Sequence, residues 1–284
     1  MSATARVLND AAATPRAIVF RTRGSSHGPI TRLVSPSDVG ELIKPFVFLD
    51  AFAAIPGNGP QFGWHPHSGI ATLTVLLEGQ VGYEETTGVK GVLNAGGVEW
   101  MRAAGGVWHT GTMNGRERVK GFQLWVALPP ELENGAPQSR YLSNEEVPVD
   151  GPARVVLGRY GDAVSAIPAP AGMNYLDMRL KAGERWRYQP PQGHTVVWVA
   201  VHEGVLHTPQ AVPAGELAVF DRSDAAIEFE AQGDTGFVLG SAVPHPHELV
   251  LGYYSVHTSR AALDQGEREI DRIGQLLRAD GRLR

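Results

Sequence analysis

Short apolar runs alternate with turns rich in glycine and proline along most of the chain. The runs are β-branched or aromatic, and the chain carries 34 glycines and 20 prolines, more than a helical protein tolerates. The runs are AIVF (17–20), FVFL (46–49), IATLTVLL (70–77), GVEWM (97–101), FQLWVAL (122–128), YLDMRL (175–180), TVVWVAV (195–201), ELAVF (216–220) and FVLGSAV (237–243). Closely spaced strands of this kind predict an all-β protein built as a sandwich or barrel.

Three segments lack this strand pattern and suggest how the chain is divided. Residues 1–16 are small and polar, which indicates a flexible N-terminal arm, and residues 131–153 are polar and proline-rich, which is typical of a linker. Residues 259–279 have apolar side chains at helical spacing, so they predict one amphipathic C-terminal helix. The resulting plan is a first domain at 17–130 and a second at 154–284.

The two strand series also resemble each other, which matters because repeated units determine architecture. An apolar strand ending in Glu-Gly occurs at 75–79 and at 199–204, and Ala-Gly before an apolar strand occurs at 95–96 and at 214–215. Residues 121–129 match residues 236–244 at the glycine, Phe, Leu, Ala and Pro positions. Two related β-domains explain these matches better than one irregular domain.

Composition narrows the possible functions. The chain has no cysteine, which excludes disulfides, iron–sulfur clusters and thiol nucleophiles, so any metal must be held by histidines and carboxylates. Its net charge of −5 gives no basic surface for nucleic acid, so we expect no direct nucleic-acid binding. We find neither an apolar stretch long enough to span a membrane nor a secretory signal, and we therefore expect a cytoplasmic protein with no membrane contact.

Three histidines in the first half are candidate metal ligands. His65 and His67 flank Pro66 at the start of an apolar strand, where alternate residues point to the same face. His109 follows a Gly-Gly pair that permits a tight backbone turn. The pattern favours a three-histidine metal site, although each histidine taken alone is more often a packing residue. The similar His-Pro-His at 245–247 follows a strand, and we expect a loop there.

These segments resemble the pirin family of the cupin superfamily from about residue 46 to residue 274. The resemblance is carried by FVFLDAF (46–52), HPHSGIATLTVLLEG (65–79), GVLNAGGVEWMRAAGGVWH (91–109), GFQLWVALPPE (121–131) and LVLGYYSVHTSRAALDQ (249–265). It implies two cupin barrels of jelly-roll type packed together, with one divalent transition metal, most often iron, in the first barrel. Projected through the repeat, the ligand positions fall near 190–192 and 224–228, where there is no histidine, and His194 stands alone nearby.

The chain departs from the pirin pattern at both carboxylates that accompany the histidines. The Glu usual two residues after the third histidine is Gly111, and the Glu common after His-Pro-His is Ala71. Three neutral imidazoles leave the charge of a divalent ion uncompensated, so we expect weaker metal retention and room for an anionic ligand. Glu84, Glu85 or Glu99 can substitute only if the fold brings one within about 2.2 Å of the metal.

Two functions follow from the resemblance, and a third is possible from the barrel alone. Pirins are associated with quercetin 2,3-dioxygenase activity on a flavonol or related aromatic substrate, although Gly111 leaves no evident catalytic base. They also resemble non-catalytic regulators or redox sensors that bind a protein partner. A barrel mouth can also bind a small apolar ligand without metal. Trp64, Met101 and Trp108 flank the histidines and are candidates to line a substrate pocket, with packing in the barrel core as the alternative.

Overall fold

The computed structural model describes residues 16–56 and 62–283, and these residues form mainly strands. The predicted N-terminal arm lies outside the described residues except for Arg16. The described strands of the first half are β2 (Ser25–His27), β3 (Ile30–Val34), β4 (Phe46–Ala54), β5 (Phe62–His67), β6 (Ile70–Glu78), β7 (Gln80–Glu85), β8 (Lys90–Asn94), β9 (Val98–Arg102), β10 (Val107–Asn114), β11 (Val119–Ala127) and β12 (Gln138–Leu142). A short helix, α1 (Val39–Ile43), precedes β4.

The second half repeats this arrangement. Its strands are β13 (Val149–Asp150), β14 (Ala153–Leu157), β15 (Arg159–Tyr160), β16 (Ala163–Val164), β17 (Met173–Leu180), β18 (Arg185–Tyr188), β19 (Val196–Glu203), β20 (Val205–Thr208), β21 (Gln210–Pro213), β22 (Glu216–Phe220), β23 (Ile227–Ala231) and β24 (Thr235–Ala242). A 3-10 turn, η1 (Asn144–Glu146), joins the halves. The chain ends with the hairpin β25 (Val250–Leu251) and β26 (Val256–His257), followed by helix α2 (Arg260–Ala279).

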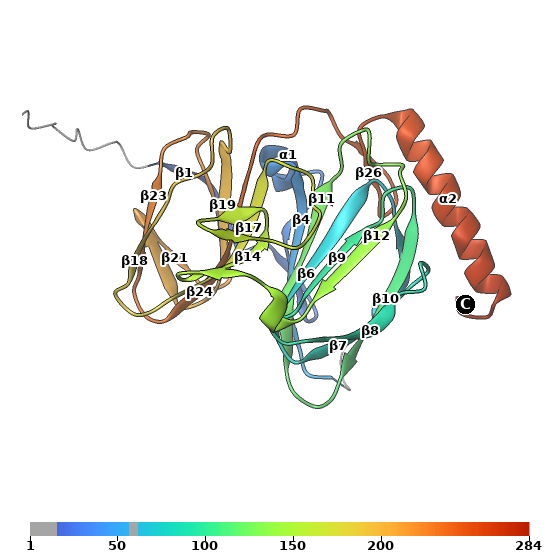
Figure 1. Ribbon diagram of the computed structural model, residues 1–284, viewed down its shortest axis with the longest axis horizontal. Helices are drawn as coiled ribbons and strands as arrows, with labels where there is room; N and C mark the ends of the chain where they lie inside the picture. Colours follow the sequence, from blue (N-terminus) through green and yellow to red (C-terminus); the bar gives the residue numbers. More distant parts are fainter. Residues whose placement is uncertain (1–15, 57–61, 284) are drawn as a thin grey trace, which may run out of the picture.

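Each half is a barrel made of one seven-stranded and one four-stranded sheet (Figure 1). The first barrel has the orders β12-β9-β6-β11-β4-β3-β2 and β5-β10-β7-β8. The second has β1-β22-β19-β24-β17-β14-β13 and β18-β23-β20-β21, where β1 is Ile18–Thr22. Matching strands therefore occupy matching places, which confirms the predicted repeat and the prediction of two cupin-type barrels with a C-terminal helix.

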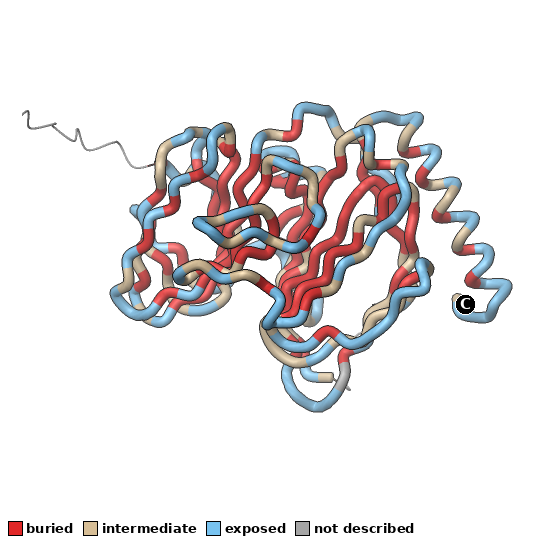
Figure 2. The backbone as a smooth tube through the Cα atoms, viewed as in Figure 1, coloured by how far each residue is buried: buried red, intermediate tan, exposed pale blue. Residues whose placement is uncertain are grey.

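The two seven-stranded sheets pack face to face and form a shared core. One buried cluster contains side chains from both, including Leu73 and Leu124 of the first barrel and Trp198 and Val238 of the second. The ring of Phe46 meets the ring of Trp198 edge to face at 5.5 Å between centroids. Figure 2 shows these buried strands side by side in the middle of the molecule. Because this apolar surface is continuous, the two barrels are held in one fixed arrangement.

The interiors of the two barrels differ. The second is filled by aromatic side chains that contact one another at 5.4 to 6.3 Å between ring centroids: Trp186, Tyr188, Phe220, Phe229 and Phe237. The first leaves a cavity of about 440 Å³. The first barrel therefore has an interior with room for a ligand beside its histidines.

The ends of the chain depart from the predicted domain boundaries. Strand β1, expected in the first domain, pairs with β22 of the second barrel. Strand β12, expected in the linker, pairs with β9 and completes the sheet of the first barrel. The hairpin β25–β26 and helix α2 come after the second barrel but pack on the first. Strands β1 and β12 each pair with a strand whose backbone N–H and C=O groups would otherwise be unpaired at the sheet edge.

Helix α2 matches the predicted C-terminal helix. The side chain of Ser259 accepts a hydrogen bond from the backbone N–H of Ala262 and so caps its start. Its buried face carries two glycines, Gly266 and Gly274, and a Cβ atom at Gly274 would lie 2.8 Å from the Trp108 ring. The glycines therefore allow the helix to lie close against the barrel. No helix in the described ranges is long and apolar enough to cross a membrane.

Candidate metal centre

The three predicted histidines come together inside the first barrel. Strands β5 and β10 are antiparallel neighbours, and His109 lies directly opposite His65. One ring nitrogen from each of His65, His67 and His109 lies within 4.8 Å of the other two. The ring centroids are 4.3 to 5.1 Å apart. Two histidines on one face of a strand and a third on the facing strand thus form one cluster, as their spacing predicts.

The Nδ1 atom of each imidazole faces an acceptor. His65 Nδ1 lies 2.7 Å from the carbonyl oxygen of Gly63, and His67 Nδ1 lies 3.2 Å from that of Tyr254. Carbonyls only accept, so both Nδ1 atoms carry the hydrogen and leave Nε2 with a free lone pair. His109 Nδ1 lies 3.7 Å from a carboxylate oxygen of Glu99. Outer contacts of this kind orient histidines that bind metal.

Burial keeps the three imidazoles neutral. Desolvation lowers the pKa of His65, and it lowers the pKa values of His67 and His109 well below the ordinary value, with a further contribution from the neighbouring histidines. Neutral imidazole is the form that coordinates a metal. Moreover, Nε2 of His109 is buried without a hydrogen-bond partner in the described structure. Such an atom costs about 1–3 kcal/mol unless something binds it, so the residues fit a divalent transition metal.

Of the three carboxylates considered as substitutes, only Glu99 faces this site. Glu84 pairs with Arg282 at 2.6 Å in an exposed ion pair. Glu85 lies in the same strand but accepts hydrogen bonds from the hydroxyls of Thr87 and Ser139 at 2.6 and 2.7 Å. The acceptor capacity of Glu85 is therefore already used by neighbouring hydroxyl groups.

Glu99 is buried beside the histidines, and only one of its two carboxylate oxygens forms a hydrogen bond in the described structure. Its Oε2 accepts a hydrogen bond from the Thr74 hydroxyl at 2.5 Å, whereas its Oε1 is buried without a hydrogen bond among the described residues and lies 3.7 Å from His109 Nδ1. Desolvation raises the pKa of this carboxyl to about 7. Glu99 can therefore exchange a proton near neutral pH, which is what a general base requires.

Of the two positions that lack the family carboxylate, one lies at the cavity and the other lies in the core between the barrels. Gly111 lines the cavity, and a Cβ atom there would meet Phe62 at 3.5 Å and Val81 at 3.7 Å, ordinary contact distances. Ala71 is completely buried in the core shared by the barrels. The opposite face of strand β6 carries Thr74, which lines the cavity. Only position 111 can therefore present a side chain to the site.

The cavity beside the histidines has an aromatic wall. The rings of Phe48 and Trp125 stack at 4.0 Å between centroids, with an interplanar angle of 7°. The Arg32 guanidinium lies 3.9 Å from the Phe48 ring centroid, and the His67 ring meets Trp125 edge to face at 4.9 Å. All four side chains line the cavity. Because Trp125 covers one face of Phe48 and Arg32 covers the other, this wall offers ring edges, which suit edge-to-face packing with an aromatic ligand.

Of the three residues predicted to line the pocket, the structure places one at the cavity and two elsewhere. Trp64 lines the cavity, but Trp108 and Met101 are not among its lining residues. Trp108 alternates with His109 along β10, so its ring points outward, and its indole nitrogen donates to the carbonyl of Ile270 in α2 at 2.7 Å. Met101 is fully buried, in an apolar cluster with Ala103 and Val107.

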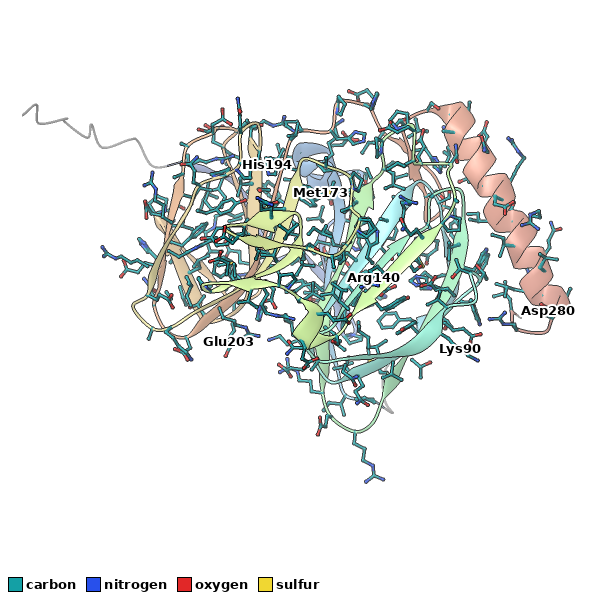
Figure 3. The ribbon with its side chains drawn as sticks, viewed as in Figure 1. Lys90, Arg140, Met173, His194, Glu203 and Asp280 are labelled. Carbon is teal, nitrogen blue, oxygen red and sulfur yellow. The ribbon has the colours of Figure 1, made fainter. Side chains whose placement is uncertain are left out.

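The second barrel carries aromatic residues where the first has histidines. The last residue of β5 pairs with the first residue of β10, and the last residue of β18 likewise pairs with the first of β23. Counted from these ends, the histidine positions correspond to Trp186, Tyr188 and Phe229, close to but not within the segments that the repeat offsets predict. His194, labelled in Figure 3, is buried in this barrel. Its Nδ1 lies 3.0 Å from the Ser241 hydroxyl. The His-Pro-His at 245–247 lies in a loop, as expected.

One residue of the cavity comes from a segment that sequence reasoning did not connect with it. Tyr254, in the turn of the β25–β26 hairpin, lines the cavity, and its ring centroid lies 5.8 Å from that of His65. The resemblance to a known family extends over this segment, but no local pattern indicates that it returns to the first barrel.

Comparisons with known proteins agree with this architecture. A family model described as Pirin matches residues 29–126. A Pseudomonas aeruginosa protein named "Putative quercetin 2,3-dioxygenase" is 31% identical over 269 residues, covering 88% of this chain and 93% of the relative. Mouse pirin is 31% identical over 240 residues, covering 78% of this chain and 81% of its own.

Solved structures show the same fold. A crystal structure described as quercetin 2,3-dioxygenase from Acinetobacter baumannii has a TM-score of 0.82 at 23% identity, covering 91% of this chain and 98% of that one. The structure of the bacterial pirin YhhW from Escherichia coli in complex with nickel(II) has a TM-score of 0.63 at 21% identity, covering 81% and 96%. At these identities the likeness concerns the fold.

Proposed function

Because the chain belongs to the pirin family of cupin proteins, we propose that its first barrel is a metal-dependent dioxygenase site for a planar, hydroxylated aromatic substrate of the flavonol type. One observation carries this proposal: three neutral histidines converge beside a cavity of about 440 Å³ with a stacked aromatic wall. His65, His67 and His109 would hold the metal, which when bound supplies a Lewis acid with open positions for substrate and dioxygen. Iron is the metal we expect.

The residues of this chain supply binding and proton transfer. The stacked side chains of Phe48 and Trp125 form one wall of the cavity, against which the substrate ring can pack edge to face. Glu99 lines the cavity and takes the part of the carboxylate absent at Gly111 by accepting the proton of the substrate hydroxyl. The Thr74 hydroxyl holds one oxygen of Glu99 in place.

Oxygen uptake with quercetin tests this proposal. Protein reconstituted separately with iron, nickel, cobalt, manganese and copper is assayed with an oxygen electrode, and His109→Ala should abolish both metal retention and oxygen uptake. His247→Ala is the matched control, because this exposed histidine belongs to the second His-Pro-His and lies in a loop. Absence of oxygen uptake with all five metals would refute the dioxygenase.

A second candidate function is a non-catalytic, metal-dependent binding protein or redox sensor. The observation that favours it is the glycine at position 111, because a site that does not turn over substrate has no need of a carboxylate on the metal. Under this proposal a protein partner is captured in stoichiometric amount by the metal-loaded chain and released by a chelator. Equal capture by His109→Ala would contradict it.

A further inference from the structure

The rim of the cavity is completed by a segment that follows the second barrel. Strands β25 and β26 form a hairpin whose turn contains Tyr253 and Tyr254. The side chain of Tyr254 lines the cavity and is 39% exposed, whereas Tyr253 does not line it and is 69% exposed. Tyr254 therefore has one side toward the histidines and the other toward solvent, as expected of a residue at an entrance.

Tyr254 contacts the metal site in two separate ways. Its ring centroid lies 5.8 Å from that of His65 and 5.9 Å from that of His67. Its backbone carbonyl accepts the Nδ1 hydrogen of His67 at 3.2 Å. The ring can be changed without removing the carbonyl, so these contributions can be tested independently.

The backbone of Tyr254 is held in an unfavourable conformation. Its φ angle is +57°, a left-handed conformation that costs a bulky residue about 1–2 kcal/mol. Such a conformation persists only where surrounding contacts fix it, and it is common at ligand-binding sites.

Buried hydrogen bonds supply the contacts that fix the turn. The Ser68 hydroxyl, next in sequence to His67, donates to the Ser255 hydroxyl at 2.9 Å, and His257 Nε2 lies 3.0 Å from the same Ser68 oxygen. The backbone N–H of Tyr253 donates to a carboxylate oxygen of Glu267 in α2 at 3.0 Å. The hairpin is thus fastened both to the strand that carries His67 and to the C-terminal helix.

The Ser68–His257 pair does not constitute a nucleophilic site, although a carboxylate oxygen of Glu133 lies 3.4 Å from His257 Nδ1. Ser68 has no exposed surface, and His257 and Glu133 are 1% and 2% exposed. A substrate cannot reach the Ser68 hydroxyl, so this arrangement holds the hairpin in place.

We infer that Tyr254 is a specificity-determining residue of the cavity, with its ring placed to contact the planar aromatic part of a ligand bound beside His65 and His67. This inference rests on the proposed function, since it concerns the ligand of the same site. The rings of Trp125 and Tyr254 both line the cavity and lie 4.9 and 5.9 Å from the His67 ring, so an aromatic ligand bound beside His67 lies within reach of the Tyr254 ring. A small anion such as azide has no aromatic surface to pack against the Tyr254 ring.

Binding measurements on Tyr254→Asn test the inference. Asparagine tolerates the left-handed backbone and keeps the carbonyl that faces His67, but it lacks the ring. With cobalt(II)-loaded protein, quercetin and azide are titrated separately and followed by absorbance. We expect quercetin affinity to fall about 3- to 10-fold, from the loss of one aromatic contact, while azide and cobalt affinities stay unchanged.

Tyr253→Asn is the matched control, because it removes the neighbouring ring that does not line the cavity. It should leave quercetin affinity as in the unsubstituted protein. The inference is overturned if Tyr254→Asn binds quercetin normally, if both variants lose affinity equally, or if the unsubstituted protein binds no quercetin. Dependence of quercetin binding on Tyr254 without any oxygen uptake would support the inference and refute the dioxygenase.

Discussion

Placing a carboxylate at position 111 should tighten metal binding, and the size of the effect can be estimated. A Cβ atom at Gly111 meets only ordinary contacts of 3.5 Å or more, and Gly111 is not among the glycines with positive φ, so Glu fits without backbone strain. At an effective dielectric constant of about 20, two unit charges about 4 Å apart attract by about 4 kcal/mol. Desolvation and side-chain ordering offset about 2 kcal/mol of this attraction. The remainder corresponds to an affinity increase of about 10- to 100-fold.

Competition with a chelator measures this change for cobalt(II) and nickel(II). Gly111→Gln is the matched control, because it has the same shape without the charge, and Gly111→Ala reports the effect of the Cβ atom alone. We expect Glu to tighten binding and Gln to leave it within about 3-fold of the unsubstituted protein. Equal affinity for the Glu and Gln variants, both folded by circular dichroism, would show that the absent charge does not limit metal retention.

Three further predictions concern stability, each measured by urea unfolding of the metal-free protein. Burial raises the pKa of Glu99 from 4.5 to about 7, so this carboxyl ionises at a lower pH in the unfolded chain than in the folded protein. The free energy of unfolding should therefore decrease as the pH rises from 4.5 to about 7. Glu99→Gln should remove the loss, and an unchanged pH profile would contradict it. Burial, with Arg179 and Lys120 nearby, lowers the pKa of His202 from 6.5 to about 3, so stability falls as the pH decreases below 6.5. His202→Gln should reduce that acid loss, and a variant as acid-sensitive as the unsubstituted protein would refute the assignment. Gly266→Ala adds a Cβ atom 2.5 Å from a buried hydroxyl oxygen. The cost of overpacking should exceed the gain in helix propensity, so we expect a net loss of about 1 kcal/mol in the free energy of unfolding. A more stable variant would show that α2 can shift away from the barrel.

The fold and the histidine cluster could be predicted from the sequence because both depend on local periodicity. His65 and His67 share a face by strand alternation, and the repeat of strand series predicts that two barrels form. The same alternation applies to Trp108, which must point away from the side that His109 faces. Trp64 also flanks a histidine yet lines the cavity, so proximity in sequence to a ligand does not decide which residues line it.

The remaining features depend on strand pairing between distant segments, which no local pattern encodes. Glu99 reaches the site because β9 lies beside β6 in the sheet, and Tyr254 reaches it because the chain returns after the second barrel. β1 is apolar enough to predict a strand, but nothing in its composition tells which barrel it joins. The barrel that such a strand joins depends on which sheet edges are unpaired when the rest of the molecule has folded.

The exchange of chain ends also bears on how the protein is made. Synthesis produces the first barrel's histidines early, yet the carbonyl that faces His67 and the helix that packs on Trp108 belong to the last 30 residues of the described chain. β1, synthesised first among the described strands, finds its partner β22 only after some 200 further residues have followed. A ribosome-bound chain arrested after the second barrel would hold three histidines without their final support. We therefore expect firm metal retention only after the C-terminal segment has packed on the first barrel.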